Sequence, residues 1–378
     1  MSRRTREQIG LDMPRYSGTA ASAKMCEALV SDLLEAGFRV VRQTVPFDKW
    51  SAIGDTYLAV NTHRLNACGM IYSPSVSVSG VLEAVGRKQL IGVFDWRHFS
   101  VIDDRGCEVA QIVATDSGPA IPLALDPKSA NLPTLIIGCE DGNKISELTG
   151  DPTRSVRVEI SLRTCREKAQ LDNIIGSYCL AGANTDGASE VIITAHYDTV
   201  YGSPGANDNG SGMLCALKTA TILREHMNNG SLPKNTRLVV AFFGGEELLQ
   251  IGSRHYLAER VADNSLDSIA LVLNLDMVGV GEHFWPWVDN KTELTLQQAL
   301  ADLPCAHEVR VLNPPLAGDH YPFYELGLPS SCFIWWPDAN YHQAGDVVSM
   351  LDESKIEYTA RLAAKFVSYH LRNTKHQG

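Results

Sequence analysis

The sequence contains no hydrophobic run long enough to cross a membrane, and no apolar segment follows its basic N-terminal stretch as a secretory signal would require. Basic residues are also scarce, because 33 Lys and Arg stand against 44 Asp and Glu, a formal net charge of −11. Binding to phosphate-rich partners depends on basic patches. These absences predict a cytoplasmic protein that binds neither nucleic acid nor a membrane.

Paired cysteine motifs are missing as well. The nine cysteines are odd in number and scattered without C-x-x-C spacing, a pattern typical of reduced thiols and not of a disulfide framework. The chain has no internal repeat and no low-complexity tract. With 378 residues, 44% of them hydrophobic, it is long enough for a large core and a second unit.

One stretch, residues 191–212, combines an apolar run with a His-x-Asp triplet and a glycine-rich turn (VIITAHYDTVYGSPGANDNGSG). Residues 191–193 have the pattern of a short buried strand, which the Gly, Pro and Asn residues bring to an end. We therefore expect His196, Asp198 and Asp208 on loops just beyond the carboxyl end of a strand. Open α/β sheets place their sites at this edge.

Three further apolar runs end in ionisable residues. These are Glu246 and Glu247 after residues 237–245, Asp276 within residues 268–280, and Tyr341 and His342 after residues 330–336. Four strand ends of this kind are more than packing alone explains, and convergent groups of this sort indicate a site. Carboxylates mixed with imidazoles suit zinc, cobalt or manganese. The sequence therefore predicts a metal site at one edge of an α/β sheet.

The order of these motifs resembles that of the co-catalytic zinc aminopeptidases of metallopeptidase family 28, which includes glutamate carboxypeptidase II. The matching segments are His196-Tyr197-Asp198, residues 205–212 (GANDNGSG), Gly245-Glu246-Glu247, Asn274-Leu275-Asp276 and Tyr341-His342. Residues 318–323 (GDHYPF) resemble a further family motif near the substrate groove. Two positions depart from the family pattern: Gly318 stands where Ser is common, and Leu249 where glycine is usual.

The resemblance implies two zinc ions, with cobalt or manganese as alternatives. The implied ligands are Asp208 as the bridge, His196 and Asp276 at one position, and Glu247 and His342 at the other. Two ions close together need such a shared carboxylate. The related M20 group fits less well, because its bridging aspartate lies much further from the His-x-Asp triplet than it does here.

Three further residues receive roles from the same resemblance. Asp198 would orient the imidazole of His196. Glu246 would be the general base and then the general acid, with a redundant metal ligand as its alternative role. Tyr341 is either a donor to the oxyanion or a core tyrosine.

The domain organisation follows from a change of pattern near residue 50. Residues 1–50 and 165–378 are predicted to form the catalytic domain, with a mixed, mostly parallel sheet flanked by helices. Residues 51–164 contain short β-branched runs separated by turns, namely 76–78, 81–85, 90–94 and 132–137. We expect a small β-rich insert that resembles a protease-associated domain. Its role stays open between a lid over the groove and a stability or dimerisation module.

These observations favour an aminopeptidase that acts on peptides with a free N-terminus. Alternatives are a single-zinc glutaminyl cyclase, a carboxypeptidase acting on acidic C-termini, and a non-catalytic binding module like the transferrin receptor. A homo-oligomer is also compatible with the sequence. An aromatic segment, residues 281–287 (GEHFWPW), either lines an apolar specificity pocket or caps the core.

Overall fold

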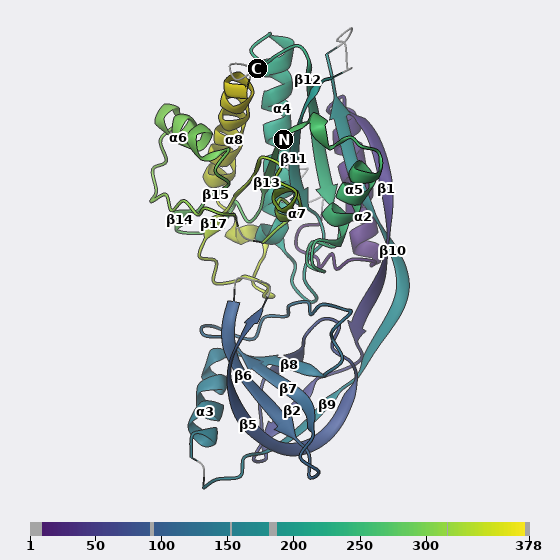
Figure 1. The fold of residues 1–378 in the computed structure, drawn as a ribbon, viewed down its shortest axis with the longest axis vertical. Coiled ribbons are helices and arrows are strands. Elements are labelled where there is room, and N and C mark those ends of the chain that lie inside the picture. The colour runs from purple at the N-terminus through teal and green to yellow at the C-terminus, as the bar shows by residue number, and fades with distance from the viewer. Residues whose placement is uncertain (1–9, 91–93, 152, 181–186, 316, 375–378) are drawn as a thin grey trace. The chain divides into compact units, whose positions relative to one another are not determined.

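The computed structural model describes residues 10–90, 94–151, 153–180, 187–315 and 317–374 (Figure 1). The chain divides into a large unit, residues 1–46 with 170–378, and a small unit, residues 47–169. The sequence predicted an insert at residues 51–164, so the two sets of boundaries differ by four or five residues at each end.

The large unit contains one main sheet, a two-stranded ribbon and six α-helices among its described residues. The sheet has the strand order β1-β10-β12-β11-β13-β16-β15. Its strands are β1 (Arg39–Ala52), β10 (Thr164–Tyr178), β11 (Ser189–His196), β12 (Thr236–Phe243), β13 (Ile269–Leu275), β15 (Trp287–Val288) and β16 (Ser330–Phe333). The ribbon pairs β14 (His283–Phe284) with β17 (Trp335–Trp336). The helices are α2 (Ala20–Glu35), α4 (Gly212–Asn228), α5 (Ile251–Ala262), α6 (Glu293–Asp302), α7 (Tyr321–Glu325) and α8 (Glu353–Thr374).

Four central strands of this sheet run parallel in the order β12, β11, β13 and β16. Within them, Ile193 is paired with Val240 on one side and Leu273 on the other. The flanking strands β10 and β15 run antiparallel to their neighbours. The predicted α/β fold with a mixed, mostly parallel sheet is therefore confirmed.

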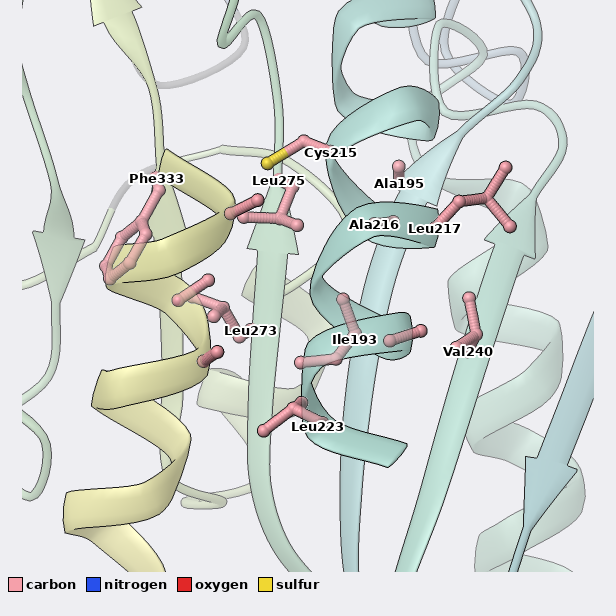
Figure 2. Packing of buried hydrophobic residues seen from close by; sticks show 14 of the residues in the cluster. Ile193, Ala195, Cys215, Ala216, Leu217, Leu223, Val240, Leu273, Leu275 and Phe333 are labelled. Atoms are coloured by element: carbon pink, nitrogen blue, oxygen red, sulfur yellow. The ribbon is translucent and has the colours of Figure 1, made fainter. Parts of the chain in front are cut away.

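Both faces of the sheet are buried, because successive side chains of a strand point to opposite faces. Ile193 packs into the core beneath α2, α4 and α8, whereas Ile192 packs into a second core with α5 and α7. Figure 2 shows α4 lying along the first face. The labelled side chains are Cys215, Ala216, Leu217 and Leu223 from α4, Ile193 and Ala195 from β11, Val240 from β12, Leu273 and Leu275 from β13, and Phe333 from β16.

The small unit is built on an eight-stranded sheet in the order β3-β2-β9-β5-β6-β7-β8-β4. Its elements are β2 (Tyr57–Val60), β3 (His63–Arg64), β4 (Ala67–Gly69), β5 (Val76–Leu90), β6 (Phe94–Ile102), β7 (Glu108–Ala114), β8 (Thr134–Ile137), α3 (Cys139–Thr149) and β9 (Arg157–Leu162). This sheet encloses a core of its own. The unit is β-rich, as expected, and its likeness to a protease-associated domain stays a prediction.

Two strand predictions need correction. Residues 76–78 and 81–85 are parts of one strand, β5, because Gly80 does not mark a turn. A Cβ at Gly80 would lie 2.5 Å from the carbonyl oxygen of Ile102, so this glycine allows close approach of β6. Residues 330–336 form two strands, β16 and β17, instead of one. Of the predicted run 90–94, residues 91–93 lie outside the described residues.

None of the described helices combines the length and the apolar composition that a membrane span requires.

Candidate metal centre

The predicted metal ligands gather at the carboxyl ends of the parallel strands. β11 ends at His196, and β13 ends one residue before Asp276. Glu247 follows β12 after a Gly-Gly turn, in which Gly245 has a φ of +71°. Because parallel strands present their carboxyl ends at the same edge of a sheet, residues far apart in the sequence meet here.

Asp208 lies between two histidines. Its Oδ1 is 3.2 Å from Nε2 of His196, and its Oδ2 is 3.2 Å from Nε2 of His342. All three side chains are buried. Asp208 itself follows the glycine-rich turn and begins a cis peptide bond to Asn209. One carboxylate thus faces both imidazoles through different oxygens.

Each imidazole has a second carboxylate beside it. Oδ1 of Asp276 is 3.5 Å from Nε2 of His196, and Oε2 of Glu247 is 3.1 Å from Nε2 of His342. Oδ1 of Asp276 is buried and makes no hydrogen bond among the described residues. His196, Asp208 and Glu247 each offer a ligand atom, and these atoms lie within 4.8 Å of one another. The five predicted ligands are therefore brought together as two sets that share Asp208.

The electrostatics of this cluster fit a cation. Burial disfavours the charged imidazole of His196, but Asp276, Asp198 and Asp208 outweigh it and raise its pKa well above the usual range. For His342, burial is likewise outweighed, chiefly by Glu247 and Asp208, and its pKa rises to about 10. Several buried carboxylates thus require positive charge among them. Imidazole nitrogen and carboxylate oxygen are a donor set that suits zinc, so the residues present fit this metal.

Asp198 holds the backbone beside the metal ligands. Its Oδ2 accepts a hydrogen bond from the hydroxyl of Ser17 at 3.0 Å, and its Oδ1 accepts one from the backbone N–H of Glu246 at 3.2 Å. Nδ1 of His196 lies 3.2 Å from the backbone carbonyl of Asp198 and 3.6 Å from its carboxylate. The expected orienting contact to His196 is therefore closer through the main chain of Asp198 than through its side chain.

Glu246 and Glu247 are adjacent but have different surroundings. Oε1 of Glu247 accepts the backbone N–H of Val200 at 2.9 Å while its Oε2 faces His342. The side chain of Glu246 makes no ion pair with either histidine among the described residues. Burial is the main reason why the pKa of Glu246 is raised well above its usual range, and Glu247 adds to the effect.

The backbone after Glu247 is left-handed at Leu249, the position where the family usually has glycine. Leu249 and Gln250 have φ values of +68° and +57°, in the left-handed region that side chains other than glycine rarely adopt. Leu249 therefore takes a backbone conformation suited to the glycine that is usual at this position. Gln250 then leads directly into α5.

An aromatic series adjoins the metal site at His342. The ring of Tyr341 stacks on that imidazole with centroids 3.8 Å apart. The ring of Trp336 follows, with its centroid 5.5 Å from that of Tyr341. The ring of Trp285 lies 6.4 Å from Trp336 and 5.9 Å from Trp287, again between centroids. Trp285 and Trp287 of the 281–287 segment thus belong to this series, whereas Phe284 packs in the core.

The motif that begins at Gly318 reaches the same region. Oδ1 of Asp319 accepts the hydroxyl of Ser253 at 2.6 Å, and burial raises the pKa of Asp319 to about 7. His320 is fully buried against Trp287, with ring centroids 6.1 Å apart. A Cβ at Gly318 would meet Nδ2 of Asn274 at 3.2 Å, so this position leaves space for the buried polar groups around it.

Sequence reasoning missed two residues that fix the loop of Asp208. Asp346 accepts the backbone N–H groups of Asn207 and Asp208, and Arg15 binds the carbonyls of Pro204 and Gly205. No short motif contains either residue together with the loop. Only the position of Asp346, four residues after His342, offered a local signal.

Comparison with known proteins agrees with this geometry. The model of peptidase family M28 matches residues 173–367, just over half of the chain. Aminopeptidase YwaD of Bacillus subtilis (strain 168) is 26% identical over 399 residues, which cover 98% of this chain and 83% of that protein.

Two solved structures share the fold. BSAP, a zinc aminopeptidase from Bacillus subtilis, superposes with a TM-score of 0.71 at 21% identity, covering 96% of this chain and 93% of its own. An Acidobacteriales bacterium glutaminyl cyclase has a TM-score of 0.53 at 16% identity, with 99% and 93% covered. The resemblance predicted from the motifs is confirmed by the family match. The chain therefore belongs to peptidase family M28 and is an enzyme, a hydrolytic metallo-exopeptidase.

Proposed function

We propose that this enzyme is a dinuclear zinc aminopeptidase that removes N-terminal residues from peptides. The observation that carries the proposal is the position of Asp208, whose two oxygens each face a different imidazole at 3.2 Å. A carboxylate in this position suits two ions that share a ligand. His196 and Asp276 would complete one ion's ligands, and Glu247 and His342 those of the other.

Zinc is the metal that the donor set and a relative support best. BSAP, which shares the fold, is a zinc aminopeptidase. Cobalt and manganese also accept imidazole and carboxylate ligands, so they are the alternatives. A divalent ion in such a site supplies Lewis-acid activation of a carbonyl group and of water.

Glu246 is proposed as the group that moves the proton. Its backbone N–H is held by Asp198, and within the described part of the chain its side chain forms no ion pair with His196 or His342. Its raised pKa fits a carboxylate that takes a proton from water and returns it to the departing amine near neutral pH. Tyr341, stacked on His342, is proposed as a donor to the oxygen that becomes negative as the carbonyl is attacked.

The surroundings of the site support a substrate with a free amine. The carboxyl groups of Glu246, Asp276 and Asp319 influence one another electrostatically, and a bound ammonium group would stabilise their charged forms. Within the aromatic series, the half-buried rings of Tyr341, Trp336 and Trp285 offer an apolar surface, whereas Trp287 is buried. We therefore propose that apolar or aromatic N-terminal residues are preferred, because such side chains gain most from apolar burial.

The requirement for a free N-terminus in the substrate can be tested directly. Matched dipeptides and tripeptides, unblocked or N-acetylated, would be incubated with the zinc-loaded enzyme before and after chelation, and amino-acid release would be followed. Release from the unblocked peptides alone, abolished by chelator and restored by zinc, is the expected result. Release from acetylated peptides at the C-terminal end would instead identify a carboxypeptidase.

A glutaminyl cyclase is the second candidate, because a cyclase shares the fold over nearly the whole chain. A peptide with N-terminal glutamine separates the two: an aminopeptidase releases glutamine, and a cyclase leaves the peptide bond intact and releases ammonia. The aminopeptidase is favoured because Asp208 faces two imidazoles, which suits two ions, whereas the cyclase alternative uses a single zinc.

The remaining expectations extend this proposal. A cytoplasmic location fits the nine cysteines, all of which are free thiols. The substrates of the enzyme would be peptides, with no role for nucleic acid or a membrane, and the net charge of −11 supports this proposal. Self-association into a homo-oligomer remains part of the proposal and would be measured by analytical ultracentrifugation.

A further inference from the structure

Arg15 lies outside every motif of the sequence, yet it contacts the loop that carries Asp208. We infer that Arg15 is a positioning residue of the metal site: it fixes the 204–208 loop so that both oxygens of Asp208 face their imidazoles. This inference rests on the proposed function, because it concerns how the proposed bridging carboxylate is held.

The Arg15 side chain is almost fully buried, and its N–H groups donate hydrogen bonds to main-chain carbonyls. Nη1 donates to the carbonyl of Pro204 and Nη2 to that of Gly205, both at 2.7 Å. Nε donates to the carbonyl of Tyr197 at 3.0 Å. The same guanidinium therefore joins the strand end that carries His196 to the turn that carries Asp208.

Only arginine combines these contacts. The guanidinium is planar and presents its donors in a fixed fork, whereas a lysine ammonium is a single point. The segment around Arg15 is bound as well, because its backbone N–H donates to the hydroxyl of Thr199 at 2.9 Å and Ser17 donates to Asp198.

The buried charge of Arg15 is compensated by the metal-site carboxylates. Burial lowers the pKa of Arg15 to about 10, while Asp346, Asp198 and Asp208 oppose this effect. Among the described residues, Arg15 forms no salt bridge within 4.0 Å. Its charge is thus held at the acidic site while its hydrogen bonds go to the backbone, an arrangement that fixes main-chain position.

Asp346 holds the same loop by accepting hydrogen bonds from the backbone N–H groups of the loop. Its Oδ1 accepts from Asn207 at 2.6 Å and its Oδ2 from Asp208 at 3.0 Å, while its backbone carbonyl accepts from Ala206 at 3.1 Å. Arg15 binds the two preceding carbonyls, so five consecutive residues are fixed. Gly205, in the middle, has a φ of +66°, and a Cβ there would lie 2.3 Å from the carbonyl oxygen of Asp208.

Loss of the Arg15 fork would remove the side-chain donor from the buried carbonyls of Pro204 and Tyr197. Gly205 would keep only the N–H of Gly210 among the described residues, and the loop would relax toward other partners. Both oxygens of Asp208 depend on that loop for their direction. Outer partners of metal ligands typically change metal affinity by about 10- to 100-fold when they are removed. The expected effect of changing Arg15 is therefore weaker metal binding.

The experiment compares Arg15→Lys and Arg15→Met with the unchanged protein and with Arg42→Lys and Arg42→Met. Arg42 is a suitable control because it belongs to the same unit but pairs with Glu27 at the surface. Zinc affinity of the metal-free proteins would be measured by competition with a chromophoric chelator. Circular dichroism and thermal unfolding without metal would report the fold, and kcat and KM would be measured at rising zinc concentrations.

We expect Arg15→Lys to bind zinc about 10-fold more weakly and Arg15→Met up to about 100-fold more weakly. The two Arg42 variants should match the unchanged protein. Saturating zinc should restore most of kcat in Arg15→Lys with little change in KM, which a general loss of fold would not permit.

Two results would overturn the inference. Zinc affinity within twofold of the unchanged protein in a folded Arg15 variant would remove its role at the site. Failure of both Arg15 variants to fold without metal would make Arg15 a residue of the fold alone. A lack of zinc binding by the unchanged protein would instead contradict the proposed function before any variant is compared.

Discussion

The backbone N–H of Glu246 donates a hydrogen bond to the carboxylate of Asp198 over 3.2 Å. Two residues after Asp198, the N–H of Val200 donates to the side chain of Glu247. The loop after β11 therefore fixes the first glutamate through its main chain and the second through its carboxylate. This difference would allow the two adjacent glutamates to take the separate roles proposed for them.

Replacement of Glu246 by Gln tests the proton-transfer role. The amide keeps the shape of the side chain and removes its basicity, so we expect kcat to fall by about 10²- to 10⁴-fold. Zinc content, measured by atomic emission on the dialysed protein, should stay unchanged. Loss of zinc together with activity would make Glu246 a ligand and exclude the proposed role.

The Asp208→Ala change tests the shared carboxylate. Because both of its oxygens face an imidazole, its removal should lower bound zinc from the proposed two ions per chain to one or none and abolish peptide hydrolysis. Asp302→Ala is the matched control, since Asp302 pairs with Lys365 on the surface. Two zinc ions and normal turnover in Asp208→Ala would contradict the bridging assignment.

Zinc binding should release protons. Without metal, neighbouring carboxylates raise the pKa of His196 well above the usual range and that of His342 to about 10, so both imidazoles hold a proton at neutral pH. A metal needs the neutral imidazole, and apparent zinc affinity should therefore fall as pH is lowered. Calorimetry in two buffers of different ionisation enthalpy would measure the protons released, and equal heats in both buffers would refute the prediction.

Tyr341→Phe separates the two roles that the sequence left open for this residue. If the hydroxyl donates to the oxyanion, kcat should fall by about 10²-fold or more while zinc affinity is retained. A tyrosine that only packs against His342 would lose little, because phenylalanine preserves the stacked ring. Steady-state kinetics on an unblocked dipeptide would distinguish them, and a change in kcat below twofold would favour the packing role.

The sequence predicted those parts of the site that local patterns encode. β11 and β13 are apolar runs that end at or next to His196 and Asp276, so the same short segment predicts both the strand and the metal ligand. The shared position of Asp208 is different, because it depends on a loop whose course no periodicity describes. It came from resemblance to a family.

The residues that hold that loop were beyond local prediction. Arg15 binds carbonyls 189 and 190 positions away in the chain, so only the folded structure brings them together. Asp346 looks like a common turn residue until its carboxylate meets two N–H groups. The sequence pattern divides the long strand β5 for a similar reason, since Gly80 allows the close approach of the neighbouring strand β6 and marks no turn.

His320 should make the metal-free protein sensitive to acid. Neither ring nitrogen makes a hydrogen bond among the described residues, and burial lowers the pKa of His320 to about 3. The unfolded chain binds this proton near pH 6.5, so between about pH 6.5 and 3 unfolding takes up a proton and stability decreases as pH falls.

The His320→Leu variant removes that proton uptake. Its free energy of unfolding at pH 7 should differ from that of the unchanged protein by less than about 1.5 kcal/mol, because an apolar side chain of similar size replaces a buried ring without partners. Between pH 6 and 4 its stability should fall less steeply, by up to about 1.4 kcal/mol per pH unit. Urea unfolding of both metal-free proteins across this range gives the two slopes. Parallel slopes would mean that His320 is protonated in the folded state and has a polar partner there.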